Sequence, residues 1–178
     1  MIDRRNFLRH VGSLCGAAAA VRASGALANT GGSRCVSFVH THTGETLTAN
    51  YWQDGVYRPE TLLQVNQLLR DFRTNEIHPI DPGLLDILFD LQRRAGTDSP
   101  FHVISGYRSP KTNEMLRESS SGVAQHSMHL VGRAIDIRLE SFPTARLGEL
   151  ARSLGRGGVG YYRVSDFVHV DTGRVRSW

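Results

Sequence analysis

Six short segments are rich in β-branched and aromatic residues or alternate between apolar and polar positions, as β-strands do. These predicted strands are residues 34–40, 46–52, 101–105, 133–139, 159–162 and 167–171. The first two are separated only by the polar residues 41–45 and therefore predict a hairpin. In the fourth, Ile135 and Ile137 point to one face and Asp136 points to the other. This alternation predicts a strand with one apolar and one polar face.

Three other segments place apolar residues three or four positions apart, the spacing of one face of an α-helix. The stripes are Leu62, Val65, Leu69 and Phe72 after Pro59, then Leu84, Leu85, Leu88 and Leu91, and finally Leu147, Leu150 and Leu154. The second helix has clear ends, because Asp81 suits its N-cap, Pro82 suits its first turn and Gly96 suits its stop. Ser109 and Pro110 mark the start of a further helix. The order predicts an α+β fold, with a small antiparallel sheet and flanking helices.

The first 28 residues are typical of an export signal. Arg4 and Arg5 lie in a basic segment, a weakly apolar run follows, and the small residues up to Ala28 form a cleavage site. The adjacent arginines resemble a twin-arginine signal, and Arg22 makes the apolar run a poor membrane span. We therefore expect export by the twin-arginine machinery and cleavage near Ala28. The mature domain, residues 29–178, is expected in the periplasm without a transmembrane anchor.

The 178 residues carry a formal net charge of +4 at pH 7, which raises the question of a nucleic-acid partner. The leader holds four arginines and one aspartate, so its removal leaves 17 basic and 16 acidic residues and a net charge of +1. The basic character belongs mainly to the leader, and we expect no nucleic-acid partner. Only Cys35 remains in the mature chain, so no internal disulfide can form. Core packing or a metal must hold the fold.

Two histidines and one aspartate have positions that suit a catalytic zinc site. His129 precedes the strand 133–139, and strand alternation directs Asp136 away from the apolar face and back toward His129. His169 lies in the last predicted strand, on the face opposite its valines. Two imidazoles and a carboxylate suit Zn²⁺, and three protein ligands leave a fourth position for water. For each residue taken alone, a satisfied polar group at a strand end is the alternative.

The segment 127–136 resembles the zinc D-Ala-D-Ala metallopeptidases, a family that shares its fold with hedgehog signalling domains. Its pattern is His-x-x-Gly-x-Ala-x-Asp, with Ser-Gly-Tyr-Arg-Ser at 105–109 before it and His169 after it. The leader and several other motifs are similar to the twin-arginine-exported murein endopeptidase K subgroup. These motifs are Thr43-Gly44-Glu45, Ile80-Asp81-Pro82-Gly83, GGVGYY at 157–162 and FVHVDTG at 167–173. The resemblance implies a hedgehog/DD-peptidase-like fold and one catalytic Zn²⁺ held by His129, Asp136 and His169.

The resemblance also implies roles for three charged residues. Arg108 matches the arginine of the family motif and is expected to stabilise the oxyanion or to hold a substrate carboxylate, with a surface ion pair as the alternative. Many relatives place a carboxylate three residues before the last histidine ligand, where this chain has Asp166. Asp171 shares a strand face with His169 and either takes the proton of water or orients the imidazole. We favour Asp171 as the general base, because the strand fixes its direction.

The remaining histidines lack the spacing of metal ligands. His40, His42, His78 and His102 are expected on the surface or in loops, and His126 is expected outside the ligand set. Ser127 is expected either to touch the substrate or to cap the loop.

These residues and motifs predict a periplasmic zinc endopeptidase that hydrolyses the peptide cross-links of peptidoglycan during cell-wall growth or remodelling. The resemblance suggests the L,D links between two diaminopimelate residues. A D,D-carboxypeptidase or dipeptidase would use the same metal site in a groove closed at one end. A peptidoglycan-binding module without hydrolysis is the alternative from another class.

Overall fold

The computed structural model describes residues 32–120 and 122–178, which form four α-helices, one 3-10 helix and eight strands. The strands are β1 (Ser33–His40), β2 (Thr46–Gln53), β3 (Val56–Tyr57), β4 (Phe101–Ser105), β5 (Ala134–Leu139), β6 (Gly158–Tyr162), β7 (Phe167–Asp171) and β8 (Arg176–Ser177). The helices are α1 (Pro59–Leu68), α2 (Pro82–Ala95), α3 (Pro110–Ser119), η1 (Met128–Val131) and α4 (Thr144–Leu154). The expected leader, residues 1–28, lies outside the described residues, so its export signal and cleavage site stay predictions.

All eight strands form one mixed sheet in the order β3-β2-β1-β4-β5-β7-β6-β8. The α+β class is confirmed, and so is the hairpin, because β1 and β2 are antiparallel neighbours. The predicted small antiparallel sheet is wrong in its detail, since the sheet has eight strands and β1 pairs with β4 and β6 pairs with β8 in parallel. A parallel pair needs a long crossover connection, which leaves no local pattern in the sequence. The strands β3 and β8 have two residues each, too few to show alternation.

The ends of α2 follow from its terminal residues. The Asp81 carboxylate accepts a hydrogen bond from the Gly83 backbone N–H at 2.9 Å, and Pro82 occupies the first turn. Gly96 ends the helix with φ of 68°, in the left-handed region that glycine adopts at little cost. The four leucines of the predicted stripe are all buried. Local residue chemistry therefore sets both ends and the inward face of this helix.

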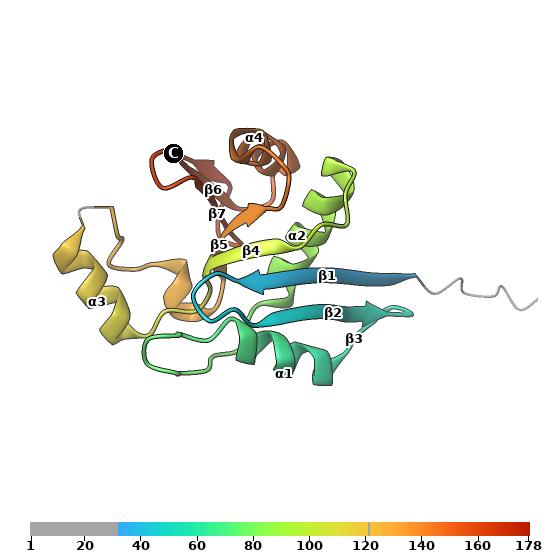
Figure 1. The fold of residues 1–178 in the computed structure, drawn as a ribbon, viewed down its shortest axis with the longest axis horizontal. Coiled ribbons are helices and arrows are strands. Elements are labelled where there is room, and N and C mark those ends of the chain that lie inside the picture. Colours follow the sequence, from blue (N-terminus) through green and yellow to red (C-terminus); the bar gives the residue numbers. More distant parts are fainter. Residues whose placement is uncertain (1–31, 121) are drawn as a thin grey trace, which may run out of the picture.

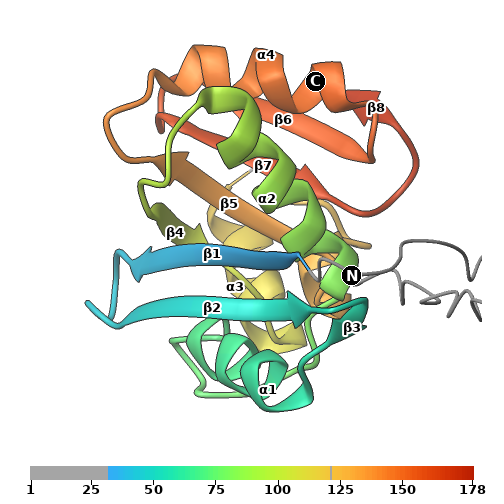
Figure 2. The same ribbon diagram turned by 90° about the vertical axis from the view of Figure 1, so that its right-hand side faces the viewer.

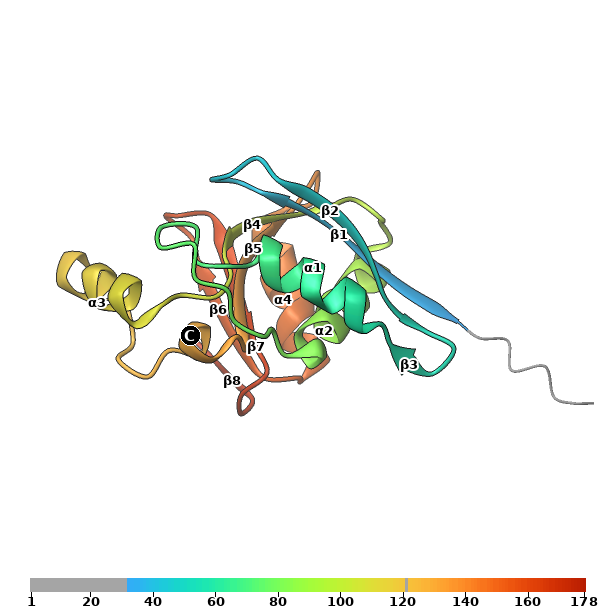
Figure 3. The same cartoon turned by 90° about the horizontal axis from the view of Figure 1, so that it is seen from below.

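Helices α1, α2 and α4 lie on one face of the curved sheet, and α3 stands apart on the other side (Figures 1, 2 and 3). Figure 2 shows α2 crossing in front of β1 and β5, with α4 beside β6 and β7. Between these helices and the sheet lies the core, which includes Phe38, Ile135, Ile137 and Val168. Each such side chain contributes about 1.5–3 kcal/mol by leaving water. Because strand residues alternate, the packing that buries Ile135 and Ile137 turns Asp136 to the opposite face.

Two details differ from the sequence expectations. The apolar stripe predicts a helix reaching toward Phe72, whereas α1 ends at Leu68 and the chain turns, with the Asn75 N–H donating to the Asp71 carbonyl. His40 is buried and packs edge-on against Phe72, so its expected place on the surface or in a loop is wrong. Its position at the end of β1, under the residues that follow α1, could not be inferred from local spacing. Within the described part of the chain, no helix has the length and apolar character needed to span a membrane.

Candidate metal centre

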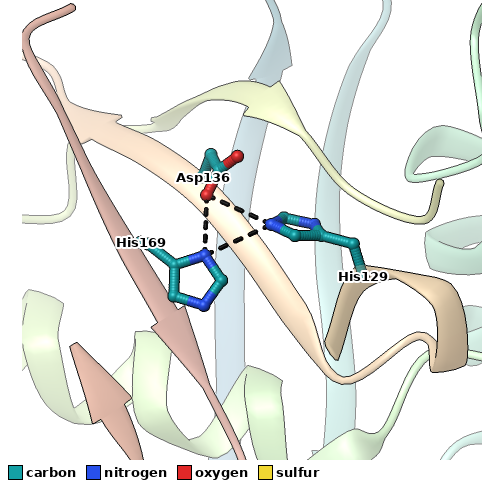
Figure 4. A group of neighbouring side chains, drawn as sticks. All are labelled: His129, Asp136 and His169. Carbon is teal, nitrogen blue, oxygen red and sulfur yellow. Dashed lines mark hydrogen bonds and ion pairs between the residues drawn. The ribbon is translucent and has the colours of Figure 1, made fainter. Parts of the chain in front are cut away.

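Three side chains meet on the sheet face opposite α2: His129, Asp136 and His169 (Figure 4). Asp136 of β5 lies directly opposite His169 of β7 in the antiparallel register, and His129 reaches both from η1. Asp136 Oδ1 is 2.9 Å from His169 Nδ1 and 3.2 Å from His129 Nε2, and the two ring nitrogens are 3.2 Å apart. All three residues are buried. The three residues that the sequence analysis singled out therefore form a cluster. In residues 32–120 and 122–178 it is the one group with three potential metal ligands within 4.8 Å of one another.

The short helix η1 fixes the position of His129. Ser127 caps it, since its hydroxyl accepts a hydrogen bond from the His129 N–H at 3.4 Å. Gly132 ends it with φ of 64°, and a Cβ there would overlap the carbonyl oxygen of Pro79. The glycine of the His-x-x-Gly pattern is therefore a backbone requirement. The sequence predicts a loop here, because a single 3-10 turn is too short for a periodic pattern.

In each imidazole, the ring nitrogen that points away from the cluster forms a hydrogen bond with an oxygen atom. His129 Nδ1 is 2.6 Å from the Gly106 carbonyl oxygen, which can only accept, so the ring donates there and Nε2 carries the lone pair. His169 Nε2 is 3.1 Å from the Asp171 carboxylate, which leaves Nδ1 facing Asp136. Metal-binding histidines typically have this arrangement, in which the outer nitrogen donates to a carbonyl or carboxylate. The donor set of two nitrogens and one oxygen fits a metal ion of the zinc type.

Burial and opposite charges set the protonation of the cluster. Burial lowers the pKa of His129, which favours the neutral ring that a metal needs. Burial acts to raise the pKa of Asp136, but His129, His169 and Arg108 outweigh it and hold that pKa well below its usual value. Burial also acts to lower the pKa of His169, and hydrogen bonds to Asp136 and Asp171 raise it above its usual value instead. A cation is therefore favoured between these groups, either a proton or a metal.

Arg108 lies beside the cluster, between α3 and the end of β4. Its guanidinium donates through Nη2 to Asp136 Oδ2 and through Nε to Ser105 Oγ at 2.8 Å. Most of its side chain is buried, and it lines the adjoining cavity. The alternative of a surface ion pair does not describe this buried pairing. Asp136 thus turns one oxygen to the histidines and the other to Arg108.

Asp171 is fully buried behind His169, on the side of the ring away from Asp136. Its carboxylate accepts hydrogen bonds from the backbone N–H groups of Gly158 and Gly173, at 3.0 and 2.8 Å, and from Arg176 at 2.7 Å. Burial acts to raise its pKa, but the hydrogen bonds from His169 and Arg176 lower that pKa far below its usual value. Of the two roles expected for Asp171, this geometry favours the orientation of His169. Its role as general base stays a prediction.

Asp166 lies in the turn between β6 and β7, with φ of 49°. Its carboxylate is exposed, 3.6 Å from Arg138 Nε. Its neighbours Ser165 and Phe167 line the cavity at the cluster, whereas Asp166 does not. The structure therefore brings five of the six predicted site residues together and leaves Asp166 one residue away from the cavity wall.

A cavity of about 520 Å³ opens beside the cluster. Ser120 and residues within 122–129 form one wall. Ser127 is one of them, so it both caps η1 and faces the cavity. His126 also lines it but is not part of the ligand cluster. Tyr162 lines the cavity and Tyr161 packs against the core, which divides the two adjacent tyrosines between wall and interior.

Sequence reasoning missed several residues of this cavity, among them Arg176 and Trp178. They belong to the last residues of the chain, where β8 is too short to leave a strand signal. Gly158 and Gly160 of the GGVGYY segment were the available signal, because a glycine inside a strand often marks a close approach of other atoms.

Comparison with known proteins gives consistent matches over this chain. A family model described as peptidoglycan L,D-endopeptidase MepK, within peptidase family M15, matches residues 28–178. The peptidoglycan L,D-endopeptidase MepK of Escherichia coli K12 is 42% identical over 176 residues, which cover 99% of this chain and 97% of that protein. The probable peptidoglycan L,D-endopeptidase MepK of Haemophilus influenzae is 41% identical over 154 residues, which cover 86% of this chain and 83% of that protein.

Proposed function

This chain belongs to the peptidoglycan L,D-endopeptidase MepK family of M15 metallopeptidases, and we propose that it cuts the links between two diaminopimelate residues with one Zn²⁺ held by His129, Asp136 and His169. The chain is a murein endopeptidase by family. The observation that carries the zinc proposal is the setting of the two imidazoles, each with its outer nitrogen bound to an oxygen and its inner nitrogen facing Asp136.

Bound Zn²⁺ supplies Lewis-acid chemistry, which polarises a scissile carbonyl and makes water a stronger nucleophile at neutral pH. The residues of this chain position the metal ligands. Gly106 and Asp171 hold the rings of His129 and His169 in the orientation that ligation needs. Arg108 keeps the second oxygen of Asp136 occupied, so that the first oxygen faces the two histidines.

We assign Arg108 a second task, the stabilisation of the negative charge that forms on the carbonyl oxygen. Its Nε and one N–H of Nη2 are engaged by Ser105 and Asp136, which fixes the plane of the group. Its other donors belong to a side chain that lines the cavity. A donor that is held in place before the reaction needs no reorganisation as the charge develops, and removing one such donor typically costs about 10²–10³ in kcat.

The proton of the attacking water needs an acceptor, and two carboxylates are candidates. Asp171 accepts hydrogen bonds from His169 on one side and from Gly158, Gly173 and Arg176 on the other, so we assign it the positioning of the His169 ring. Asp166 has the spacing of the base in many similar enzymes and lies beside two residues of the cavity wall. The sequence favoured Asp171 for this role, but its enclosure behind His169 leads us to propose Asp166 as the base instead. This proposal requires the exposed turn of Asp166 to bring the carboxylate toward the substrate.

We further propose that residues 1–28 are a twin-arginine signal peptide, and that residues 29–178 act as one zinc metallopeptidase domain in the periplasm. The adjacent Arg4 and Arg5 and the small residues up to Ala28 support this division. The family match begins at residue 28, next to the proposed cleavage site. The nearly neutral charge of the remaining chain gives no electrostatic argument for a nucleic-acid partner.

The proposal is tested by incubating the zinc-loaded protein with purified sacculi and with defined cross-linked muropeptides, and by identifying the products by mass. An endopeptidase converts cross-linked dimers into monomers, whereas release of D-Ala alone would indicate a carboxypeptidase. An Asp136→Asn variant is the matched negative control, because it removes one ligand charge with little change in size. Stoichiometric zinc with no cleavage of any substrate would reject the enzymatic proposal.

A further inference from the structure

The end of the chain forms one wall of the cavity, next to His169. The Trp178 N–H donates to the Val159 carbonyl, and the Tyr161 N–H donates to the Trp178 carbonyl, both at 3.2 Å. The last residue is therefore bound to β6 like a strand residue. Arg176 and Trp178 both line the cavity, and the Trp178 ring centroid is 5.3 Å from that of His169.

Two glycines of β6 make room for these side chains. A Cβ at Gly158 would overlap the Arg176 guanidinium, and a Cβ at Gly160 would lie 2.6 Å from the Trp178 ring. The indole also donates through Nε1 to the Tyr162 hydroxyl at 3.0 Å, and Arg176 Cζ lies 5.0 Å from its centroid. The space above Gly158 and the contact with the Trp178 ring thus hold the Arg176 guanidinium in one place at the cavity.

Only part of the hydrogen-bonding capacity of Arg176 is used. Its Nη1 donates to Asp171 Oδ1 and to the Arg174 carbonyl, both at 3.1 Å, and its Nη2 donates to Asp171 Oδ2 at 2.7 Å. A guanidinium has five N–H donors, so Nε–H and the second N–H of Nη2 have no acceptor in the described part of the chain. These two lie along one edge of the planar group, which is the edge that binds a carboxylate with two parallel hydrogen bonds.

The proposed substrate carries such a carboxylate. In a link between two diaminopimelate residues, the carbon that bears the scissile nitrogen also bears a free carboxylate. Arg108 and Arg176 are the arginines that line the cavity, and Arg108 is the one that we assign to the reacting carbonyl. Arg176 is partly exposed, with its side chain at 32%. Arg176 lines the same cavity as His129, Asp136 and His169, and its unoccupied edge is therefore available to a substrate carboxylate.

We infer that Arg176 binds the free carboxylate next to the scissile amide and that Trp178 forms the apolar wall for the adjoining aliphatic chain. This inference rests on the proposed function and assigns the recognition of the cross-link to Arg176 of β8 and to Trp178, which follows that strand. It divides two tasks between two arginines, with Arg108 at the reacting carbonyl and Arg176 at the carboxylate beside it.

The test compares two substrates, a peptide cross-linked through two diaminopimelate residues and the same peptide with that one carboxylate converted to a carboxamide. We expect wild-type protein to prefer the carboxylate by about 10- to 100-fold in kcat/KM, the range for loss of hydrogen bonds to a charged group. In Arg176→Gln and Arg176→Lys variants this preference should fall to within about 3-fold. Arg174→Gln, the same charge change at an exposed position of the same segment, should keep the wild-type preference.

The ratio of the two substrates separates recognition from a structural role. If Arg176 only neutralises Asp171, its substitution slows both substrates equally and the preference remains, which would overturn the inference. Should a variant be too slow to assay, calorimetric binding of the two peptides to the zinc-loaded variant gives the same comparison. A wild-type protein that cuts both peptides equally well also overturns the inference, whereas one that cuts neither rejects the proposed function instead.

Discussion

His169 is held between two carboxylates that have different tasks. Asp136 lies at Nδ1, where it shares the proposed metal position with His129. Asp171 lies at Nε2, where hydrogen bonds from His169, Gly158, Gly173 and Arg176 lower its pKa and hold it in place. The same residue type therefore has two roles, because one carboxylate is turned toward the cavity and the other is enclosed behind the ring. Single substitutions of the aspartates can test these roles separately.

Replacement of Asp171 by Asn should weaken zinc binding by about 10–100-fold, because the His169 ring loses the charged partner that orients it and raises its basicity. Replacement of Asp166 by Asn should leave zinc binding unchanged and reduce cleavage. Competition with a chromophoric chelator gives the affinity, and muropeptide cleavage gives the rate. If the Asp171 variant binds zinc as tightly as wild type, the orienting role is wrong, and full activity of the Asp166 variant would exclude it as the base.

At the scale of elements, the site depends on a short helix set against the sheet. η1 carries one of the three proposed ligands, β5 and β7 carry the other two, and Gly132 connects η1 to β5. The Asp81 N–H donates to the Gly132 carbonyl at 2.9 Å, which also ties this junction to the start of α2. A change at Gly132 should therefore reach both the fold and the metal ligands.

We expect Gly132→Ala to lower the free energy of unfolding by more than about 3 kcal/mol, since it combines a left-handed φ with overlap on the Pro79 carbonyl. Gly155→Ala is the matched control, because Gly155 has φ of 63° at the end of α4 and nothing within 4 Å of an added Cβ. It should cost only the conformational penalty of about 1–2 kcal/mol. Denaturant unfolding of both variants measures the difference, and equal losses would show that the Pro79 contact is unimportant.

Across the whole molecule, a buried carboxylate on α2 links that helix to three strands. Asp86 accepts hydrogen bonds from Arg34 of β1, Tyr51 of β2 and Tyr57 of β3, at 2.6, 2.9 and 2.7 Å. Burial acts to raise the pKa of Asp86, but the hydrogen bonds from Tyr57, Arg34 and Tyr51 lower it below the usual 3.8. A pKa that is lower in the folded state stabilises the fold above the unfolded value and loses that effect as the pH falls through the folded value.

Asp86→Asn should therefore destabilise the protein at neutral pH, by about 1–3 kcal/mol, and the difference from wild type should shrink as the pH falls below about 4. Asp90→Asn, on the same helix but in an exposed pair with Arg156, should have little effect on stability. Urea unfolding at a series of pH values gives both curves. A difference between wild type and Asp86→Asn that grows on acidification would contradict the assigned sign.

Removal of the metal should affect the whole domain as well as its activity. Chelation leaves a buried carboxylate and two buried imidazoles without their cation, so we expect a lower Tm and complete loss of cleavage. Adding back Zn²⁺ should restore both, and at 100 times Kd it should stabilise the fold by about 2.7 kcal/mol. Thermal unfolding and muropeptide cleavage are measured on the same samples. Cleavage that persists after verified metal removal would reject the metal-dependent mechanism.

The sequence by itself determined the features that depend on neighbours along the chain. Asp81, Pro82 and Gly96 set the ends of α2, and alternation in β5 turned Asp136 toward His129, because caps and strand periods act over a few residues. The tertiary structure alone decided the parallel pairing of β1 with β4, the enclosure of Asp171 and the place of Arg176 and Trp178 on the cavity wall. These features depend on contacts between segments that are far apart in the chain or that lack a periodic pattern, so local spacing does not predict them. The need for glycine at positions 158 and 160 is likewise clear only from the structure, where the Arg176 and Trp178 side chains pack against them.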